Sequence, residues 1–456
     1  MEILAESSKK MTVSQLTIIT AVNMMGSGII MLPSKLAQVG TESILSWIVT
    51  LGGALCLSYG FARCGMFSKN TKNGMGGYAE YAFGKNGSFM ANFTYALSLV
   101  IANVAIGVSA VGYGAVCFGI TLSAVQTSLL TMALVIITTL ANFWGPSVTG
   151  KIGSVTVWGV IIPVVLVSVI GWFWFSGHKY ASAWNPHHLG FGKALASSIP
   201  ITLWSFLGLE SAAANGDAVE NPQKNVPIAI LTGTIIAGVI YIASTNVMAG
   251  IVDNKDLVTS TAPFGLVFSE MFNPAIGKIV MALMTIACIG SLLGWQFTVA
   301  EVFRSSAVAG YFPAVFKKVT KREAPVAGMT ILMIVQLLLS LMTMNPNLNE
   351  QFNQLVNIAV ITNLVPYVLC MASVKIIQKV AGQNDGKAKT ANFIALVAGI
   401  YSLYSMYSCG ADSMLIGAII AFFGWTCWGF IAHRFMFEQA KAEDEKYAKL
   451  NAQNKD

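Results

Sequence analysis

Long stretches without a charged residue are the feature that most limits what this chain can fold into. Residues 86–150, 152–178 and 225–252 contain no Asp, Glu, Lys or Arg. Only 10% of the 456 residues are charged, whereas 55% are apolar. A soluble protein carries about 25% charged residues to cover its surface. The composition therefore excludes a soluble globular enzyme, a disordered chain and a fibrous protein, and it indicates a protein that crosses a membrane several times.

The spanning segments are expected to be helices. The alternation typical of a membrane β-barrel is absent, and a helix satisfies its own backbone hydrogen bonds in lipid. A spanning helix needs roughly 20 mostly apolar residues. This length predicts twelve spans, near residues 13–37, 44–66, 88–117, 124–144, 153–175, 196–216, 226–251, 276–301, 327–344, 353–374, 391–408 and 413–433.

Basic residues are distributed unevenly between the predicted loops. If the N-terminus is cytoplasmic, the outside segments contain only Lys35, Lys179, Lys193, Lys255 and Lys278. This bias predicts that both termini are cytoplasmic. The net charge of +7 is then a consequence of topology, and no nucleic-acid partner is expected. Residues 1–12 and 434–456 should be short cytoplasmic segments, and no cleavable signal peptide is expected.

Cysteine and histidine form no recognisable metal or redox motif. The seven cysteines include no CxxC pair and lie almost entirely within predicted spans, so most should be small apolar helix residues. Cys64, near the cytoplasmic end of the second span, is kept as a candidate functional residue. His187 and His188 are adjacent in an outside loop, but no ligand cluster accompanies them. We therefore expect no metal and no cofactor.

Two predicted spans contain residues that break helices. The first span includes the sequence AVNMMGSGIIMLP, whose Gly-Ser-Gly fits either tight helix packing or a broken helix. The sixth span contains Pro200 and Gly208. A break near Leu207–Gly208 would let Trp204 and Glu210 face one cavity.

The positions of these breaks predict the architecture. The first and sixth spans each lead a half of five helices, residues 13–175 and 196–374. Interrupted helices at matching positions indicate a secondary transporter built on an inverted repeat. Residues 391–433 would add two helices at the C-terminal end.

Glu210 is the residue most strongly expected to be functional. A carboxylate within a membrane span is costly and marks a functional site by default. No Lys or Arg lies mid-span to form a structural ion pair with it, so Glu210 should face water, a proton or a cationic ligand.

Backbone groups freed at the breaks would add an anion site and an ammonium site beside Glu210. Trp204 and Trp295 could cover the substrate through packing and cation–π contacts, although either could instead face lipid. Asn103 in the third span is either a helix-packing residue or a ligand contact.

These segments resemble a known family of transporters. The first-span GSGI, LWSFLGLES followed by ENPQKNVPIAI, and the segments GGYAEYAFGK, WNPHH and SLLGWQFT are similar to the amino acid–polyamine–organocation transporters, and within them to the basic amino acid/polyamine antiporters. The resemblance covers nearly the whole chain. It implies an all-α, LeuT-like fold with an inverted five-plus-five helix repeat and twelve transmembrane helices, of which helices 1 and 6 are broken.

The resemblance also implies roles for individual residues. Asn23, Ser27 and Gly28 would handle the substrate's α-carboxylate and α-amino ends, and Trp295 would stack on it. The full set of implied substrate contacts is Asn23, Met24, Ser27, Gly28, Asn103, Trp204, Leu207, Glu210 and Trp295. Positions implicated in transport are Cys64, Glu80, Tyr81, Tyr95, Trp425 and Trp428. Trp428 stands where relatives have Tyr, and Met436 where they have an acidic residue.

The implied activity is the exchange of putrescine (outward) for ornithine (inward) across a bacterial inner membrane, with proton-coupled putrescine uptake as a further mode. Lysine–cadaverine or arginine–agmatine exchange remains an alternative, because one methylene discriminates by only about 1–3 kcal/mol. A cation channel is the alternative from another class, although channel filters usually need rings of carbonyls or charges. An enzyme is not expected, since Glu210 lacks catalytic partners nearby in the sequence. The lipid bilayer, putrescine, ornithine and protons are the expected partners, and a homodimer is left open.

Overall fold

The computed structural model describes residues 12–70, 73–210 and 221–453; the side chains of Ser27, Pro222, Gln223 and residues 446–453 lie outside this description. Within the described part, all regular elements are helices. The α-helices are α1 (Val13–Met24), α2 (Leu32–Val39), α3 (Ile44–Phe67), α4 (Gly74–Phe118), α5 (Ala124–Asn142), α6 (Pro146–Thr156), α7 (Trp158–Ile170), α8 (Gly177–Ser182), α9 (Phe191–Trp204), α11 (Pro222–Ile251), α12 (Asn254–Thr259), α13 (Pro263–Met271), α14 (Pro274–Val308), α15 (Val326–Met342), α16 (Leu348–Val380), α17 (Gly386–Ser408), α18 (Ala411–Ile431) and α19 (His433–Gln453). The short 3₁₀-helices are η1 (Ser27–Ile29), η2 (Thr41–Ser43), η3 (Gly171–Phe173) and η5 (Ala314–Lys317).

The helical membrane character expected from the sequence is confirmed. Eight helical segments among the described residues are long and apolar enough to cross a membrane, and α1 and α15 are apolar but shorter. Helices overlap each of the twelve predicted spans, although residues 211–216 of the sixth lie outside the described residues. The number of spans therefore stays a prediction.

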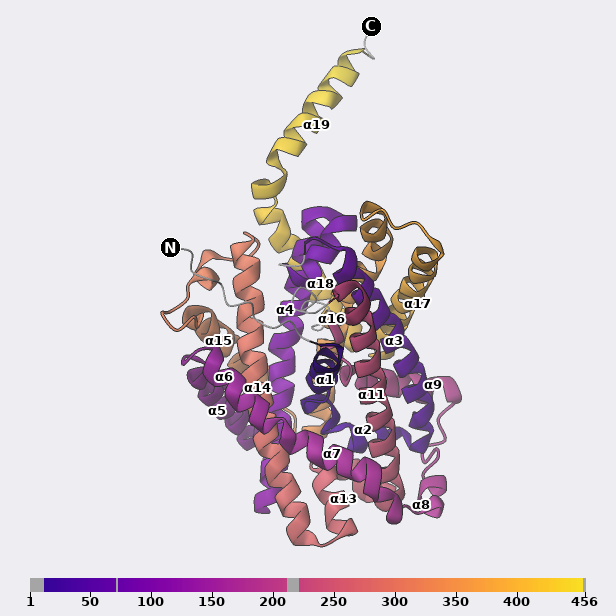
Figure 1. Ribbon diagram of the computed structural model, residues 1–456. Helices are drawn as coiled ribbons and strands as arrows, with labels where there is room; N and C mark the ends of the chain where they lie inside the picture. Colours follow the sequence, from indigo (N-terminus) through magenta and orange to yellow (C-terminus); the bar gives the residue numbers. More distant parts are fainter. Residues whose placement is uncertain (1–11, 71–72, 211–220, 454–456) are drawn as a thin grey trace, which may run out of the picture.

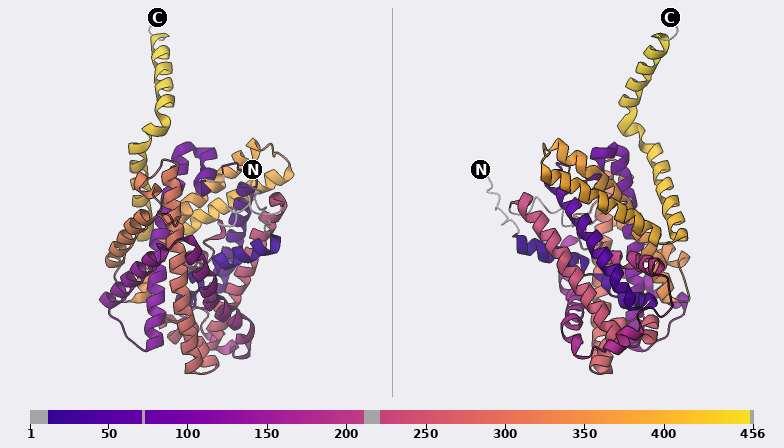
Figure 2. Two further views of the ribbon diagram at one scale, coloured as in Figure 1. Left: turned by 60° about the vertical axis from the view of Figure 1, so that its left-hand side comes forward. Right: turned by 90° about the vertical axis from the view of Figure 1, so that its right-hand side faces the viewer.

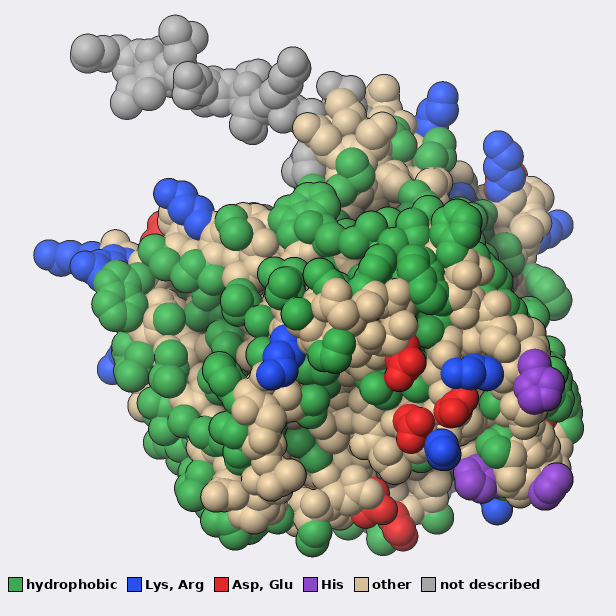
Figure 3. Space-filling model, turned by 90° about the horizontal axis from the view of Figure 1, so that it is seen from below, with side chains coloured by type: hydrophobic (Ala, Val, Ile, Leu, Met, Phe, Trp, Pro, Cys, Tyr) green, Lys and Arg blue, Asp and Glu red, His purple; other side chains and the backbone are tan. Residues whose placement is uncertain are grey.

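The helices pack into one bundle from which α19 projects (Figures 1 and 2). Helix α4 packs against α16 and α14, and α11 packs against α1 and α3. Helices α8 and α13 lie at the end of the molecule opposite α19 (Figure 1). Much of the surface seen from that end is hydrophobic, and acidic, basic and histidine side chains gather on one side of it (Figure 3).

The first predicted span is interrupted as its Gly-Ser-Gly motif allows. Helix α1 ends at Met24, one 3₁₀ turn follows in η1, and α2 begins at Leu32 with a proline in its first turn. Proline is tolerated in the first turn because the N–H groups there have no partner within the helix. The span therefore consists of two half-helices joined by non-α backbone.

The sixth predicted span is interrupted as well. Helix α9 ends at Trp204, and residues 205–208 form turns. Gly208 has a φ of +107°, a conformation that disfavours any side chain. The predicted break at Leu207–Gly208 is therefore present.

The third predicted span is longer than the sequence indicated. The prediction begins it at residue 88, but α4 starts at Gly74 and bends at Gly84, whose φ is +63°. The side chain of Asn92 accepts a hydrogen bond from the Gly76 N–H (3.1 Å), and Asn73 donates one to Ser88 (3.1 Å). These contacts hold the first turns of α4 against its later part, which hydropathy alone does not reveal.

Candidate functional site

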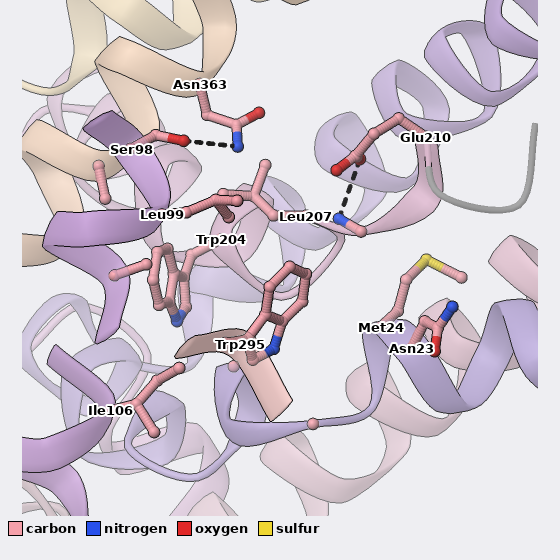
Figure 4. A pocket seen from close by; sticks show the side chains of 15 residues that line it. Asn23, Met24, Ser98, Leu99, Ile106, Trp204, Leu207, Glu210, Trp295 and Asn363 are labelled. Atoms are coloured by element: carbon pink, nitrogen blue, oxygen red, sulfur yellow. Dashed lines mark hydrogen bonds between the residues drawn. The ribbon is translucent and has the colours of Figure 1, made fainter. Parts of the chain in front are cut away.

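A central cavity lies where the two interrupted spans meet. It contains about 510 Å³ of space not occupied by atoms. Its described lining comes from both breaks and from α4, α14 and α16 (Figure 4). The lining residues are Asn23, Met24, Gly26, Gly28, Ser98, Leu99, Ala102, Ile106, Trp204, Leu207, Gly208, Glu210, Trp295, Ala359 and Asn363.

Glycines allow the two breaks to approach closely. A Cβ atom added to Gly28 would lie 3.1 Å from the Ser205 Cα, and one added to Gly208 would lie 3.3 Å from the Asn23 carbonyl oxygen. Both distances are shorter than ordinary van der Waals contact. The two segments of non-α backbone therefore face the same small space, where their polar groups can meet a ligand.

Glu210 is buried at the edge of this cavity. The Tyr95 hydroxyl donates a hydrogen bond to its Oε1 (3.0 Å), and the Gly208 N–H donates one to its Oε2 (3.0 Å). The Tyr367 hydroxyl also donates to Oε2. In these contacts both oxygens of the carboxyl group accept hydrogen bonds, and all three donors belong to the protein. Figure 4 shows the bond to Gly208.

Glu210 is the only ionisable side chain among the described residues that line the cavity. Glu210 forms no salt bridge with any described residue. The ion pairs in the described part of the chain are Lys85–Glu80, Lys179–Asp253 and Arg304–Glu301. The acidic side chain of this cavity therefore has no basic partner within the part of the chain that the structure describes.

Two indoles and one amide complete the walls. The side chains of Trp204 and Trp295 both line the cavity (Figure 4). Asn363 donates a hydrogen bond to Ser98 (3.2 Å), while its Oδ1 has no partner among the described residues. The Trp204 Nε1 is likewise buried without one. Aromatic faces beside free polar atoms suit a flexible chain that carries cationic ends.

Most of the predicted substrate contacts come together here. Asn23, Met24, Gly28, Trp204, Leu207, Glu210 and Trp295 line the cavity. Tyr95, predicted only as transport-associated, reaches Glu210. The side chain of Ser27 lies outside the described residues.

Asn103 does not line the cavity. It is fully buried, and both polar atoms of its amide lack a hydrogen-bond partner among the described residues. Helical rotation explains this placement, because Leu99, Ala102 and Ile106 occupy the cavity-facing side of α4 beside it. The substrate contact predicted for Asn103 therefore gains no support from the lining of the cavity and stays a prediction.

The other transport-associated residues lie away from the cavity. Cys64 is fully buried, and its thiol donates to the Cys370 carbonyl (3.8 Å). Glu80 pairs with Lys85, and the Tyr81 hydroxyl accepts from the Lys69 N–H (3.1 Å).

On α18, Trp425 and Trp428 face different surroundings. Trp425 is 48% exposed, whereas Trp428 is buried against Phe89, Tyr311 and Phe435. No described contact joins Trp425 or Trp428 to Glu210. The structure therefore gives these two residues no direct contact with a ligand in the central cavity.

Sequence reasoning missed the polar residues Ser98, Asn363 and Tyr367, and also the apolar lining residues Leu99, Ala102, Ile106 and Ala359. Asn363 and Tyr367 lie in the charge-free tenth predicted span, where an amide and a hydroxyl stand out and where Pro366 marks an irregularity. This pattern is the signal that could have found them. The residues that they contact are far away in the sequence, so the contacts themselves leave no local pattern.

A second and larger space, called the vestibule below, adjoins the central cavity. It contains about 1290 Å³ of unoccupied space, lies between α6, α7 and α14, and is also lined by Asn23, Gly26, Tyr95 and Trp295. The three residues Asn23, Gly26 and Trp295 line both spaces. The two spaces therefore share part of their wall.

Comparison with known proteins agrees with the class that this geometry defines, a helical membrane transporter. The family model described as amino acid permease matches residues 11–411. The putrescine transporter PotE of Escherichia coli (strain K12) is 61% identical over 428 residues, which cover 94% of this chain and 97% of that protein. PotE of Haemophilus influenzae is 57% identical over 432 residues, covering 95% and 99%. The cadaverine/lysine antiporter of Escherichia coli (strain K12) is 34% identical over 372 residues, covering 79% and 82%.

The chain belongs to the amino acid permease family, within the amino acid–polyamine–organocation superfamily. This membership confirms the resemblance found in the sequence. It also indicates a transporter rather than an enzyme.

Proposed function

We propose that this protein exchanges putrescine for ornithine across a bacterial inner membrane by alternating access. The observation that carries the proposal is the buried Glu210 carboxylate, which faces a cavity without a basic residue among its described lining. Relatives that are 57–61% identical over almost the whole chain are named as putrescine transporters, which supports a diamine as one substrate.

Each part of the cavity suits one part of these substrates. Glu210 pairs with an ammonium group, and Trp204 and Trp295 cover the methylenes between the two ends. The free Oδ1 of Asn363 accepts from an ammonium group. The irregular backbone around Gly28 receives the α-carboxylate of ornithine, which putrescine lacks.

The exchange moves charge. Near neutral pH ornithine carries about one net positive charge and putrescine about two, because each amine titrates well above that pH. One cycle therefore moves one positive charge outward, against an inside-negative potential worth about 2.3 kcal/mol per charge per 100 mV. A second mode, proton-coupled uptake of putrescine through Glu210, belongs to the same proposal.

The topology proposed for this mechanism has twelve spans, an inverted five-plus-five repeat and cytoplasmic termini. It is supported by the two interruptions, which fall in the first and sixth predicted spans. It is also supported by the position of α19 at one end and α8 at the other (Figure 1). The positive-inside distribution of Lys and Arg supports a cytoplasmic location for the α19 end.

Counterflow in proteoliposomes tests the proposed pair. Vesicles preloaded with putrescine should accumulate labelled ornithine, at a rate at least about tenfold above vesicles preloaded with cadaverine, agmatine or buffer. Faster uptake with internal cadaverine would indicate a lysine–cadaverine exchanger, in line with the relative that is 34% identical. Equal uptake into buffer-loaded vesicles would indicate a channel and contradict exchange.

Gly28→Ala is expected to separate the two substrates. The new methyl would lie 3.1 Å from the Ser205 Cα and 3.5 Å from the Trp204 carbonyl oxygen, so the two breaks must move apart. Binding of the α-carboxylate of ornithine should be weakened most. The half-saturation concentration should rise about tenfold for ornithine and about twofold for putrescine, as expected for losing a charge-assisted hydrogen bond.

Side-specific uptake assays with each labelled substrate measure this difference. Gly52→Ala is the matched control, because a Cβ at this exposed position in α3 meets no atom within 4 Å. Equal increases for both substrates would contradict a separate carboxylate site at Gly28.

A further inference from the structure

Trp295 forms part of the boundary between the central cavity and the vestibule. Of the three described residues that line both spaces, Asn23, Gly26 and Trp295, it has the largest side chain. Its neighbour Gly294 also faces the vestibule, where a Cβ would meet no atom within 4 Å. The vestibule therefore leaves room for the indole to move if α14 rotates or shifts. Holding α14 in place would prevent this movement.

Polar side chains outside both spaces hold α14 on either side of Trp295. Asn142 of α5 donates from Nδ2 to the Leu293 carbonyl oxygen (2.9 Å). Gln296 donates from Nε2 to the Val135 carbonyl oxygen of α5 (3.2 Å) and to Oε1 of Gln336 in α15 (3.1 Å). Residues 293 and 296 thus attach one face of α14 to two other helices, while Trp295 projects from another face.

These amides are fully or almost fully buried. The exposed fractions of Asn142, Gln296 and Gln336 are 0%, 5% and 1%. An apolar side chain would be the less costly choice for packing inside a membrane bundle, since a buried amide costs free energy wherever its polar atoms are unpaired. Their hydrogen bonds fix both the rotation and the height of α14, which a purely apolar contact specifies less well.

The same network extends to the wall of the vestibule. The Thr149 hydroxyl of α6 donates to Oδ1 of Asn142 (2.6 Å), and Thr149 itself lines the vestibule. A displacement of α6 would therefore act on the amide that holds Leu293, two residues before Trp295.

We propose that Asn142, Gln296 and Gln336 form a positioning clamp that keeps the Trp295 indole between the central cavity and the vestibule. The clamp makes no contact with substrate and acts only through α14. With the clamp intact, the boundary opens only together with a movement of the surrounding helices. Without it, Trp295 leaves the boundary in the absence of substrate, and the two spaces connect. The consequence for transport rests on the proposed exchange function, whereas the position of the indole does not.

Fluorescence quenching tests the clamp without any substrate. The Trp295 signal is obtained by subtracting the emission of a Trp295→Phe version from that of the parent, for the full chain in detergent. Gln296→Met keeps the side-chain volume and removes both hydrogen bonds, and it should raise iodide quenching of the Trp295 signal at least about threefold. Gln336→Met removes only the hydrogen bond between Gln296 and Gln336 and should raise the quenching less. It provides the test if the Gln296→Met protein fails to fold.

Gln351→Met is the matched control. Gln351 is also fully buried, but neither polar atom of its amide has a hydrogen-bond partner among the described residues. Its substitution should leave the Trp295 signal unchanged. Unchanged quenching in both clamp variants, or an equal rise in Gln351→Met, would overturn the proposal.

Proteoliposomes supply the transport test. The measured quantity is the ratio of two effluxes of labelled putrescine: efflux into substrate-free buffer over efflux into buffer that contains ornithine. This ratio should rise about tenfold in Gln296→Met and stay at the wild-type value in Gln351→Met. A parallel fall of both effluxes would indicate general damage and contradict the clamp. If the wild-type protein shows no ornithine-stimulated efflux, the proposed exchange fails, and the quenching result still decides on the clamp.

Discussion

Replacing Glu210 by Gln should cause the largest loss of transport of any single substitution in the cavity. The change keeps the shape of the side chain and removes the only ionisable group of the described lining. Truncating one member of a buried charge pair costs about 2 kcal/mol or more. The half-saturation concentration for putrescine should therefore rise at least about 30-fold. The loss should be smaller for ornithine, because its carboxylate keeps a second anchoring site.

The hydrogen bonds around Glu210 add to this loss. Tyr95, Tyr367 and the Gly208 N–H all donate to the carboxylate. A glutamine amide places an NH₂ group against one or more of these donors, which leaves donors facing each other in a buried site. The substitution should thus disturb the turn at Gly208 as well as the charge.

Uptake kinetics of both labelled substrates in proteoliposomes measure the effect. Glu270→Gln is the control, since it removes the same charge from an exposed position at the end of α13. It should leave both half-saturation concentrations within about twofold, as surface substitutions usually do. A Glu210→Gln protein that transports putrescine with wild-type kinetics would refute the role of this carboxylate.

Gly208→Ala should abolish most transport of both substrates. Gly208 has a φ of +107°, where any side chain is strained by about 1–2 kcal/mol. The new Cβ would also lie 3.3 Å from the Asn23 carbonyl oxygen and 3.9 Å from the Trp295 ring. Both the turn and the cavity wall must then shift, and a fall in the exchange rate of at least about tenfold is expected.

Exchange of labelled putrescine in vesicles and thermal unfolding in detergent together assess this variant. Gly399→Ala is a suitable control, because it lies in α17 and a Cβ there meets no atom within 4 Å. Alanine inside a helix should slightly stabilise the protein. Unimpaired exchange by Gly208→Ala would show that the conformation of this turn is not needed for transport.

The two breaks illustrate what local sequence can predict. Local residues indicate both breaks, because glycine and proline change backbone geometry at their own positions. These residues are Gly26, Gly28, Pro200 and Gly208. Glu210 is equally visible, since one carboxylate in a long charge-free stretch needs no knowledge of the fold to be noticed. The family resemblance then added Asn23, Met24 and Leu207, whereas six lining residues were predicted by neither route: Ser98, Leu99, Ala102, Ile106, Ala359 and Asn363.

Asn103 and Asn363 show where such reasoning ends. Both are buried amides in apolar helices, yet only Asn363 lines the cavity. In a soluble helix the polar face would distinguish them. A helix surrounded by lipid and by other helices is apolar on all sides, so its sequence does not reveal which face meets the cavity.

The sequence by itself determined that this protein is a bundle of membrane helices and that one carboxylate stands within a predicted span. It also marked two sites where a helix could be interrupted, and the structure showed that both are. These properties depend on hydropathy and on residues acting at their own positions. Only the tertiary structure decided which polar groups meet: Tyr95 and Tyr367 reach Glu210 from positions 115 and 157 residues away along the chain. Such contacts depend on how distant helices pack and rotate against each other, and no local pattern in the sequence specifies that.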